Sequence, residues 1–120
     1  MPDAQPSLTL IYRANLFVVG PGRPLLHLGR GDDNDIVVAS LFASRRHASV
    51  QFRDGAFVLT DLSSNGTFLL LERSDGDMQD ELHLRGAEAV LRGRGWIGVG
   101  KNATRHGDHS VRFTVQADTA

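Results

Sequence analysis

The sequence predicts an all-β fold, an antiparallel β-sandwich of about eleven short strands. Two observations lead to this prediction. Apolar and polar residues alternate in several short segments, such as Ala48–Phe52 and Val111–Val115, and a period of two is typical of half-buried antiparallel strands. Turn-forming residues separate these segments at short intervals, and no segment has helical periodicity. Many short strands at such spacing favour a sandwich or a barrel.

Each expected strand ends where turn-forming residues begin. In chain order, strands are expected at Leu16–Val19, Leu26–Arg30, Ala48–Phe52, Phe57–Thr60, Phe68–Leu71, Leu82–Arg85, Ala87–Arg92, Trp96–Val99 and Val111–Gln116. Turns are expected at Gly20–Gly22, Gly31–Asn34, Ser74–Asp77 and Gly107–Asp108. The dipeptide Asp54-Gly55 is expected to close a hairpin, because it suits the tight turn between paired strands.

Length and composition indicate one self-sufficient domain. The chain has 120 residues, of which 41% are hydrophobic, enough for a single core without disulfides or metals. We expect the sandwich to span residues 7–116, with flexible ends at 1–6 and 117–120. The absence of cysteine excludes disulfides and favours a reducing cytoplasm. No signal peptide and no apolar run of membrane-spanning length is visible.

The charge balance disfavours nucleic acid as a partner. The net charge is −1, from 13 Lys and Arg against 14 Asp and Glu, whereas a duplex-binding domain is usually strongly basic. Nearly all of the cations are Arg, whose planar guanidinium binds phosphate or carboxylate through two prongs. A GC-rich genome would also favour Arg.

Three polar elements fall in the expected loops. They are Leu28-Gly29-Arg30 at the end of one strand, Ser44–His47 just before another, and Asp61–Thr67 just after the strand that follows. Loops of a sandwich cluster at its two ends, and alternate connections lie at the same end. We therefore expect these three elements to converge on one apex.

The residues of this set share one chemistry. Arg30 offers a rigid fork of donors that suits a doubly charged phosphate, Ser44 offers a hydroxyl and Arg45 a second charge. Asn65 carries both a donor and an acceptor for a peptide main chain. Gly66 permits the positive φ of a tight loop. A phosphorylated residue, with about −1.5 to −2 charges and three acceptor oxygens, would match this set.

In this order and spacing, Gly29-Arg30, Ser44 with His47, and Asn65-Gly66-Thr67 resemble the motifs of the forkhead-associated (FHA) domain. The resemblance runs from Leu8 to Val115. It extends to Asp32–Asn34, Ile36, Val38 and Asp61.

The resemblance implies a sandwich of about eleven strands that binds phosphothreonine at one apex, a recognition mode built on Arg. By position, Arg30 and Ser44 would hold the phosphate, and Arg45 would be a further phosphate contact. Ser64 and Asn65 would contact the phosphate or the peptide main chain. The residues that would fix the loops are Gly29, His47, Gly66 and Thr67.

Two segments refine the resemblance. Where the family commonly has one hydrophobic residue and a second Asn-Gly, this chain continues with Phe68–Glu72, so the region that selects the peptide is expected to differ. The segment Glu81–Gly100 resembles FHA domains attached to bacterial class III nucleotide cyclases. A covalently attached effector domain is therefore one expected context.

The candidate residues also have structural interpretations. Arg30 could be a solvated surface residue, Ser44 a turn cap, and Asn65-Gly66 an ordinary hairpin turn. Leu69–Leu71 is expected to be strand core. One face of a strand cannot bury all three leucines, so one of them could face a partner.

Other site types are disfavoured. Gly93–Gly98 and Gly95–Asn102 partly match nucleotide-binding loops, but such loops need a following helix. His106 and His109 lack a third ligand, and Asp32–Asp35 lack the glycine and the distant glutamate of a calcium loop. We expect no metal and no cofactor.

Three functional classes are compared. The first is a phosphothreonine-binding module whose partner is a protein phosphorylated by a Ser/Thr kinase. The second is a phosphate-independent assembly or regulatory domain that associates through a strand face near Leu69–Leu71 or Trp96. The third, an enzyme, is disfavoured, because no carboxylate pair stands out and Ser44 and His47 lack a positioned third group.

Overall fold

The structure, a computed structural model, describes residues 5–73, 77, 81–100 and 109–116. In this part the chain forms eleven strands and no helix, and so no membrane-spanning helix. The strands are β1 (Ser7–Tyr12), β2 (Asn15–Val19), β3 (Leu25–Gly29), β4 (Ile36–Val37), β5 (Ala48–Arg53), β6 (Ala56–Asp61), β7 (Thr67–Glu72), β8 (Leu82–Leu84), β9 (Glu88–Leu91), β10 (Arg94–Val99) and β11 (Ser110–Gln116). The turns expected at 74–76 and 107–108, the histidine at 106 and the ends at 1–4 and 117–120 lie outside the described residues.

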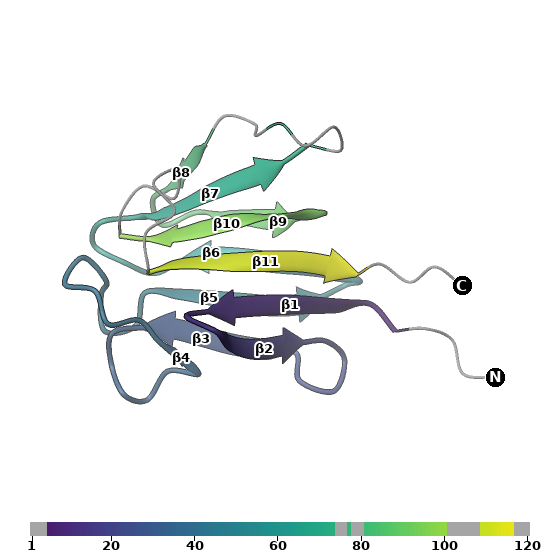
Figure 1. The fold of residues 1–120 in the computed structure, drawn as a ribbon, viewed down its shortest axis with the longest axis horizontal. Coiled ribbons are helices and arrows are strands. Elements are labelled where there is room, and N and C mark those ends of the chain that lie inside the picture. Colours follow the sequence, from purple (N-terminus) through teal and green to yellow (C-terminus); the bar gives the residue numbers. More distant parts are fainter. Residues whose placement is uncertain (1–4, 74–76, 78–80, 101–108, 117–120) are drawn as a thin grey trace.

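The strands form two stacked sheets, as Figure 1 shows, which confirms the predicted sandwich. The six-stranded sheet has the order β2-β1-β11-β10-β7-β8, and the five-stranded sheet has the order β4-β3-β5-β6-β9. The pairs are antiparallel except β3 and β4, which run parallel. Since β6 and β7 lie in different sheets, Asn65-Gly66 belongs to a crossover between sheets, and its interpretation as a hairpin turn is wrong.

The core lies between the two sheets and follows the period-two alternation of the strands. Leu8 and Leu10 of β1 and Phe113 of β11 project into it and are 0% exposed. The five-stranded sheet contributes the equally buried Leu26, Leu28, Val50 and Leu59. Full burial of an aliphatic side chain stabilises the fold by about 1.5–3 kcal/mol, so this layer positions every strand that ends at a loop.

Two tight hairpins set the register of neighbouring strands. The turn between β5 and β6 has positive φ at Asp54 and Gly55 (53° and 80°), which confirms the predicted hairpin. The turn between β1 and β2 has positive φ at Arg13 and Ala14 (48° and 71°), although neither residue favours that conformation. Positive φ at both central residues matches the twist of the paired strands.

The leucines of β7 divide between the two faces of the six-stranded sheet. Leu69 belongs to the core, and Leu71 packs against it. Leu70, opposite Trp96 of β10, lies outside the core cluster but is only 2% exposed. None of the three leucines therefore offers an exposed side chain to a partner.

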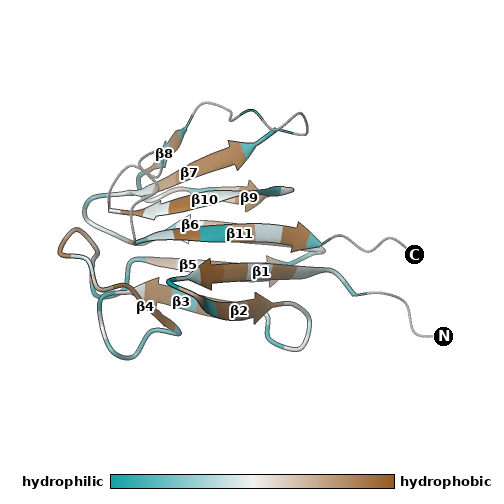
Figure 2. Cartoon of the chain, viewed as in Figure 1, coloured by the Kyte–Doolittle hydropathy of each residue, from teal (hydrophilic) through white to brown (hydrophobic). Residues whose placement is uncertain are grey.

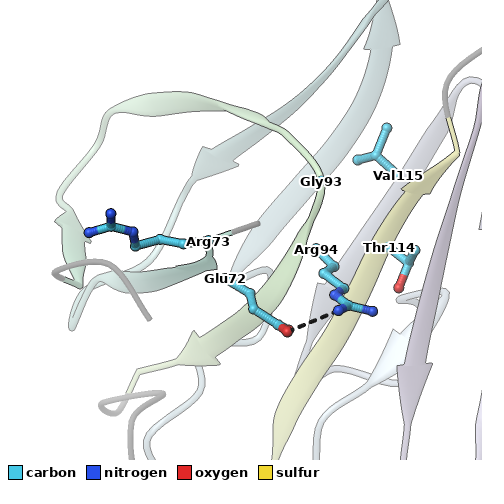
Figure 3. Close-up of a pocket in the computed structure, with 6 residues that line it drawn as sticks. All are labelled: Glu72, Arg73, Gly93, Arg94, Thr114 and Val115. Atoms are coloured by element: carbon cyan, nitrogen blue, oxygen red, sulfur yellow. Dashed lines mark ion pairs between the residues drawn. The ribbon is translucent and has the colours of Figure 1, made fainter. Parts of the chain in front are cut away.

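A hollow of about 290 Å³ lies where β7 ends and β10 begins. Its lining residues, drawn in Figure 3, include Glu72 and Arg94, which form an ion pair. Glu72 also pairs with Arg112 of β11, whose guanidinium lies 4.8 Å from the centre of the Trp96 ring. The carboxylate of this hollow is thus already neutralised by two cations.

Replacing Leu10 by Ala is expected to lower the free energy of unfolding by about 2–5 kcal/mol, because the truncation leaves a cavity in the core. Leu41→Ala removes the same atoms from a side chain that is 88% exposed. This variant should change the free energy of unfolding by less than about 0.5 kcal/mol. Urea unfolding, followed through the fluorescence of the single tryptophan, measures both variants. Equal effects would contradict this assignment of the core.

Candidate functional site

Three loops meet at one end of the sandwich, the left-hand end in Figure 1. We call the apex the residues 29–34, 41–47 and 62–66. Hydrogen bonds join the first two loops, from Arg30 N to Ser44 O (2.8 Å) and from Gly31 N to Arg45 O (3.0 Å). The third loop joins through Ser64 N, which donates to Ser44 Oγ at 3.1 Å. The predicted convergence is therefore present in the structure.

Arg30 and Arg45 line one open hollow of about 200 Å³, together with Gly31 and Asp32. Both arginines are exposed. The Nε of Arg30 donates to Ala43 O at 3.2 Å, which fixes the plane of the guanidinium at the rim. The hollow thus presents two cations and one carboxylate to solvent.

Ser44 links the loops through both its backbone and its side chain. Its hydroxyl accepts the hydrogen bond from Ser64 N, and its backbone N–H donates to Nδ1 of His47 at 2.9 Å. A hydroxyl has one donor and two acceptor sites, so the Ser44 proton remains available for a ligand. Ser44 is more than a turn cap, because the hydrogen bond to Ser64 crosses between loops.

Gly29 is needed for close contact between the first two loops. A Cβ at this position would lie 2.2 Å from Arg45 O and 2.9 Å from Nδ2 of Asn34. The Asn34 amide, 7% exposed, donates to Gly31 O (2.8 Å) and Arg45 O (2.6 Å). The expected turn at Gly31–Asn34 is present, and Asn34 ties it to the loop that carries Arg45.

His47 is fully buried and bridges two loops. Since Nδ1 accepts from Ser44 N, the proton is on Nε2, which donates to Gly66 O at 2.9 Å. Burial lowers the pKa of His47, and the Gly66 carbonyl and the Asp61 carboxylate only partly offset this effect. The imidazole is therefore held neutral, in one tautomer.

Gly66 has a φ of 94°, and a Cβ there would lie 2.1 Å from Nε2 of His83. His83 of β8 stacks on Phe68 of β7 with ring centroids 4.0 Å apart, and its Nε2 lies 3.3 Å from Asn65 O. Both the backbone conformation and the lack of space favour glycine at this position. Sequence reasoning did not single out His83, because its role depends on pairing between β7 and β8.

Asp61 fixes the third loop through hydrogen bonds to its carboxylate. Its carboxylate accepts hydrogen bonds from Ser63, the buried Thr67 hydroxyl (2.7 Å) and Gly86 N (2.8 Å). Burial raises the pKa of Asp61, but the hydrogen bonds from Gly86, Ser63 and Thr67 outweigh burial, and the net pKa lies below its usual value. Asp61 is thus an ionised organiser of the loop, and Thr67 acts with it inside the fold.

Phe42 adds an apolar component to the apex that sequence reasoning missed. The Asn65 amide donates to Phe42 O at 3.2 Å, and a Cβ at Gly100 would lie 2.0 Å from the same oxygen. Phe42 and Leu41 are 49% and 88% exposed. Two large apolar residues between Ser40 and Ser44 are unusual for a loop. This feature of the sequence could have pointed to Phe42.

The remaining candidates are surface features. Arg46 pairs with Asp33 at 3.1 Å, and the two side chains are 40% and 76% exposed. Ser64 and Asn65 are exposed at the tip of the third loop.

The segment with the glycine motifs contains the strand β10, as expected. In the described ranges, no three His, Asp or Glu side chains gather as metal ligands would.

The sequence model described as FHA domain matches residues 26–83, which run from β3 to β8 and include every predicted site residue. The chain contains an FHA domain. None of the curated proteins compared with the chain matches it. The resemblance of Glu81–Gly100 to cyclase-attached FHA domains stays a prediction.

Solved structures agree with this FHA assignment. The FHA-1 domain of Rv1747 from Mycobacterium tuberculosis is 25% identical, with a TM-score of 0.67 over 93% of this chain and 98% of that chain. Mycobacterium tuberculosis EmbR, in complex with a low-affinity phosphopeptide, is 27% identical with a TM-score of 0.64, over 98% of this chain and 26% of EmbR. This chain thus spans about a quarter of EmbR. The MEK1 FHA domain, in complex with a phosphothreonine peptide of HOP1, is 18% identical, with a TM-score of 0.62 over 91% of this chain and 96% of that chain. At this identity the similarity shows the fold alone.

The buried His47 is expected to make the FHA domain lose stability as the pH falls below 6.5, the usual histidine pKa. The unfolded chain then binds a proton that the folded chain resists, so the stability present above pH 6.5 is lost on acidification towards the lowered folded pKa. Thermal unfolding of wild type and His47→Gln at pH 7.5 and 5.5 measures this effect. The variant should be less stable at pH 7.5 and should lose less on acidification.

His27→Gln is the matched control, because His27 lies in β3, outside the joint between the loops. It should keep the pH dependence of the wild type. An unchanged pH dependence in His47→Gln would show that His47 does not resist protonation. The loss of Asp61 ionisation belongs to a separate window, below the usual carboxyl value of 3.8.

Proposed function

We propose that this FHA domain captures a phosphothreonine-bearing segment of a partner protein at the apex, as a non-catalytic recognition module. One observation carries the proposal. Arg30 lies in the first loop and Ser44 and Arg45 in the second, and backbone hydrogen bonds between these two loops hold both arginines at one open hollow, with Ser44 next to Arg45. A phosphate group brings about −1.5 to −2 charges and three acceptor oxygens, which this cluster of donors complements.

The phosphate is held mainly by Arg30 and Ser44 in this proposal. Arg30 uses one of its five N–H donors on Ala43 O, and the others are directed at the phosphate oxygens. Ser44 donates its hydroxyl proton, and Arg45, which lines the same hollow as Arg30, adds a second positive charge. Charge-assisted hydrogen bonds of this kind are about twice as strong as neutral ones.

The peptide main chain lies beside the third loop. The Asn65 amide nitrogen donates to Phe42 O, and in this proposal its side-chain carbonyl oxygen accepts from a peptide N–H. Ser64 is exposed next to it and offers a second polar contact. Because the loops are already tied together, little ordering entropy is lost on binding. With few contacts, the affinity is on the order of micromolar, about −8 kcal/mol.

The alternative functions receive less support. An apex without a ligand would not need two arginines at one hollow, which argues against a purely phosphate-independent assembly domain. For an enzyme, Ser44 would have to present its hydroxyl to His47. Instead, the backbone N–H of Ser44 donates to His47 Nδ1, while the hydroxyl accepts from Ser64 N. This geometry does not activate a nucleophile.

The biological context follows from the ligand. Phosphothreonine requires a Ser/Thr kinase upstream, and the partner is the kinase substrate. The bound phosphopeptides of EmbR and of the MEK1 FHA domain support this kind of partner. A cytoplasmic location is part of the same proposal, because a kinase and its substrates share a compartment. A covalently attached effector domain is also part of it, because Glu81–Gly100 resembles FHA domains attached to nucleotide cyclases.

Removing the Arg30 side chain is expected to weaken phosphothreonine-peptide binding at least tenfold, since a forked, charge-assisted contact is lost. A pooled phosphothreonine library, with matched phosphoserine and unphosphorylated pools, is titrated against wild type and Arg30→Ala. The wild type should prefer the phosphothreonine pool. Arg53→Ala is the matched control, because Arg53 pairs with Glu88 on another part of the surface. Equal binding of all pools by the wild type would overturn the proposal.

Neutralising Asp32 is expected to strengthen phosphopeptide binding by about twofold to threefold. Its exposed carboxylate lines the same hollow as Arg30 and Arg45 and repels a phosphate across solvent, an interaction worth under about 1 kcal/mol. Asp32→Asn is compared with Asp54→Asn, an equal charge change at the β5–β6 turn. The gain should shrink at high salt. No difference between the two variants would place the phosphate elsewhere.

A further inference from the structure

β2 forms one edge of the six-stranded sheet. It pairs with β1 alone among the described strands, and Figure 1 shows it at the border of the sandwich. Its sequence, Asn15-Leu-Phe-Val-Val19, contains no charged residue and no proline. Natural proteins usually protect such edges with charges, prolines, bulges or very short strands, because an open edge pairs with other chains.

The other edges of the two sheets have such protection. β4 has two residues and β8 has three. β9 is longer but carries Glu88, which forms an ion pair with Arg53. Among the described strands, β2 is therefore the one edge that combines length with a wholly uncharged sequence.

The backbone of β2 offers hydrogen bonds in an alternating order. The hairpin closes with Tyr12 opposite Asn15, and Phe17 lies opposite Leu10. In an antiparallel pair, residues alternate between hydrogen-bonded and non-hydrogen-bonded positions. The N–H and C=O groups of Leu16 and Val18 therefore point away from β1, towards the open edge.

The side chains next to these groups form an apolar strip. Leu16 is 63% exposed and Val18 45% exposed, and Ile11, paired with Leu16 on β1, is 40% exposed. Phe17 packs against the core and Val19 is buried, so the strand is anchored from within. Figure 2 shows hydrophobic colour over most of β2, after its polar start.

We propose that β2 pairs antiparallel with β2 of a second copy of this chain, about a two-fold axis at Phe17. In this register, Leu16 of one copy lies opposite Val18 of the other, and each such pair exchanges two hydrogen bonds. The apolar strips of both copies then meet on one face. The two sheets become one continuous sheet through the interface.

Self-pairing is favoured over a foreign strand by the symmetry of the strand. A two-fold interface must be self-complementary, and Leu16 opposite Val18 satisfies this requirement on both sides of the axis. No charge on β2 selects a complementary partner. The charged Arg13 of the two copies would lie at opposite ends of the paired strands, so like charges do not meet.

The dimer has a consequence for the apex. Because the paired β2 strands run in opposite directions, the two apices point away from each other, and both stay open. The proposal itself does not depend on phosphopeptide binding.

The first test is the mass in solution over a concentration series. Sedimentation velocity of wild type should show a dimer that forms with a dissociation constant below about 1 mM. Leu16→Lys with Val18→Lys should remain monomeric, because the charges oppose edge pairing. Leu25→Lys with Val90→Lys adds the same charge at side chains that are 43% and 37% exposed, and should dimerise like wild type.

The second test is the register. The chain has no cysteine, so a mixture of the single variants Leu16→Cys and Val18→Cys reports one contact. Their Cα atoms would lie about 5.5 Å apart, within disulfide range, and a mixed disulfide should form faster than in a mixture of Leu25→Cys and Val90→Cys. A monomeric wild type, a dimer that survives both lysines, or equal cross-linking rates would each overturn the proposal. Phosphopeptide binding by the lysine variant should be unchanged, which separates this proposal from that of the apex.

Discussion

A buried, neutral imidazole joins the two sheets at the apex, and the geometry of the candidate site depends on it. His47 accepts from Ser44 N in the loop that leads into the five-stranded sheet, and donates to Gly66 O at the start of the six-stranded sheet. A neutral histidine is a flat group that accepts on one side and donates on the other. In the cationic form both nitrogens would donate, and Nδ1 would oppose the Ser44 N–H. These two hydrogen bonds therefore set both the position of Ser44 and the neutral state of the His47 imidazole.

The other constraints at the apex act through contact distance. Gly29 lets the β3 strand end approach Arg45 O, and Gly66 lets the third loop pass beneath His83. The Asp61 carboxylate then satisfies buried donors that the crossover between sheets leaves unpaired. These features remove freedom from the loops before any ligand arrives, so binding depends on few but well-placed donors. The hollow that the two arginines line therefore lies between loops that are already held in place.

Much of the fold was predictable because period-two alternation and turn residues are local signals. Asp54-Gly55 closes the predicted hairpin, whereas the Arg13-Ala14 turn carries no such signal, since its positive φ values are imposed by strand pairing. The apex residues were predictable from their order, but the contacts of Phe42 and His83 were not. Those contacts arise from a loop and a strand that meet only in three dimensions. Leu70 shows the same limit, because its burial on the outer face depends on neighbouring strands.

In the two proposals taken together, pairing through β2 offsets the weak binding expected of a small phosphate site. The proposed contact by Arg30, Ser44 and a few loop groups has an expected affinity on the order of micromolar, which alone would hold a partner briefly. A dimer through β2 carries two such sites, and a partner that reaches both gains from the effective concentration of the second site. Because the two sites face in opposite directions, a single compact partner does not span them. The geometry therefore favours bridging between two phosphorylated chains, or one long flexible chain, over tight capture of a single one.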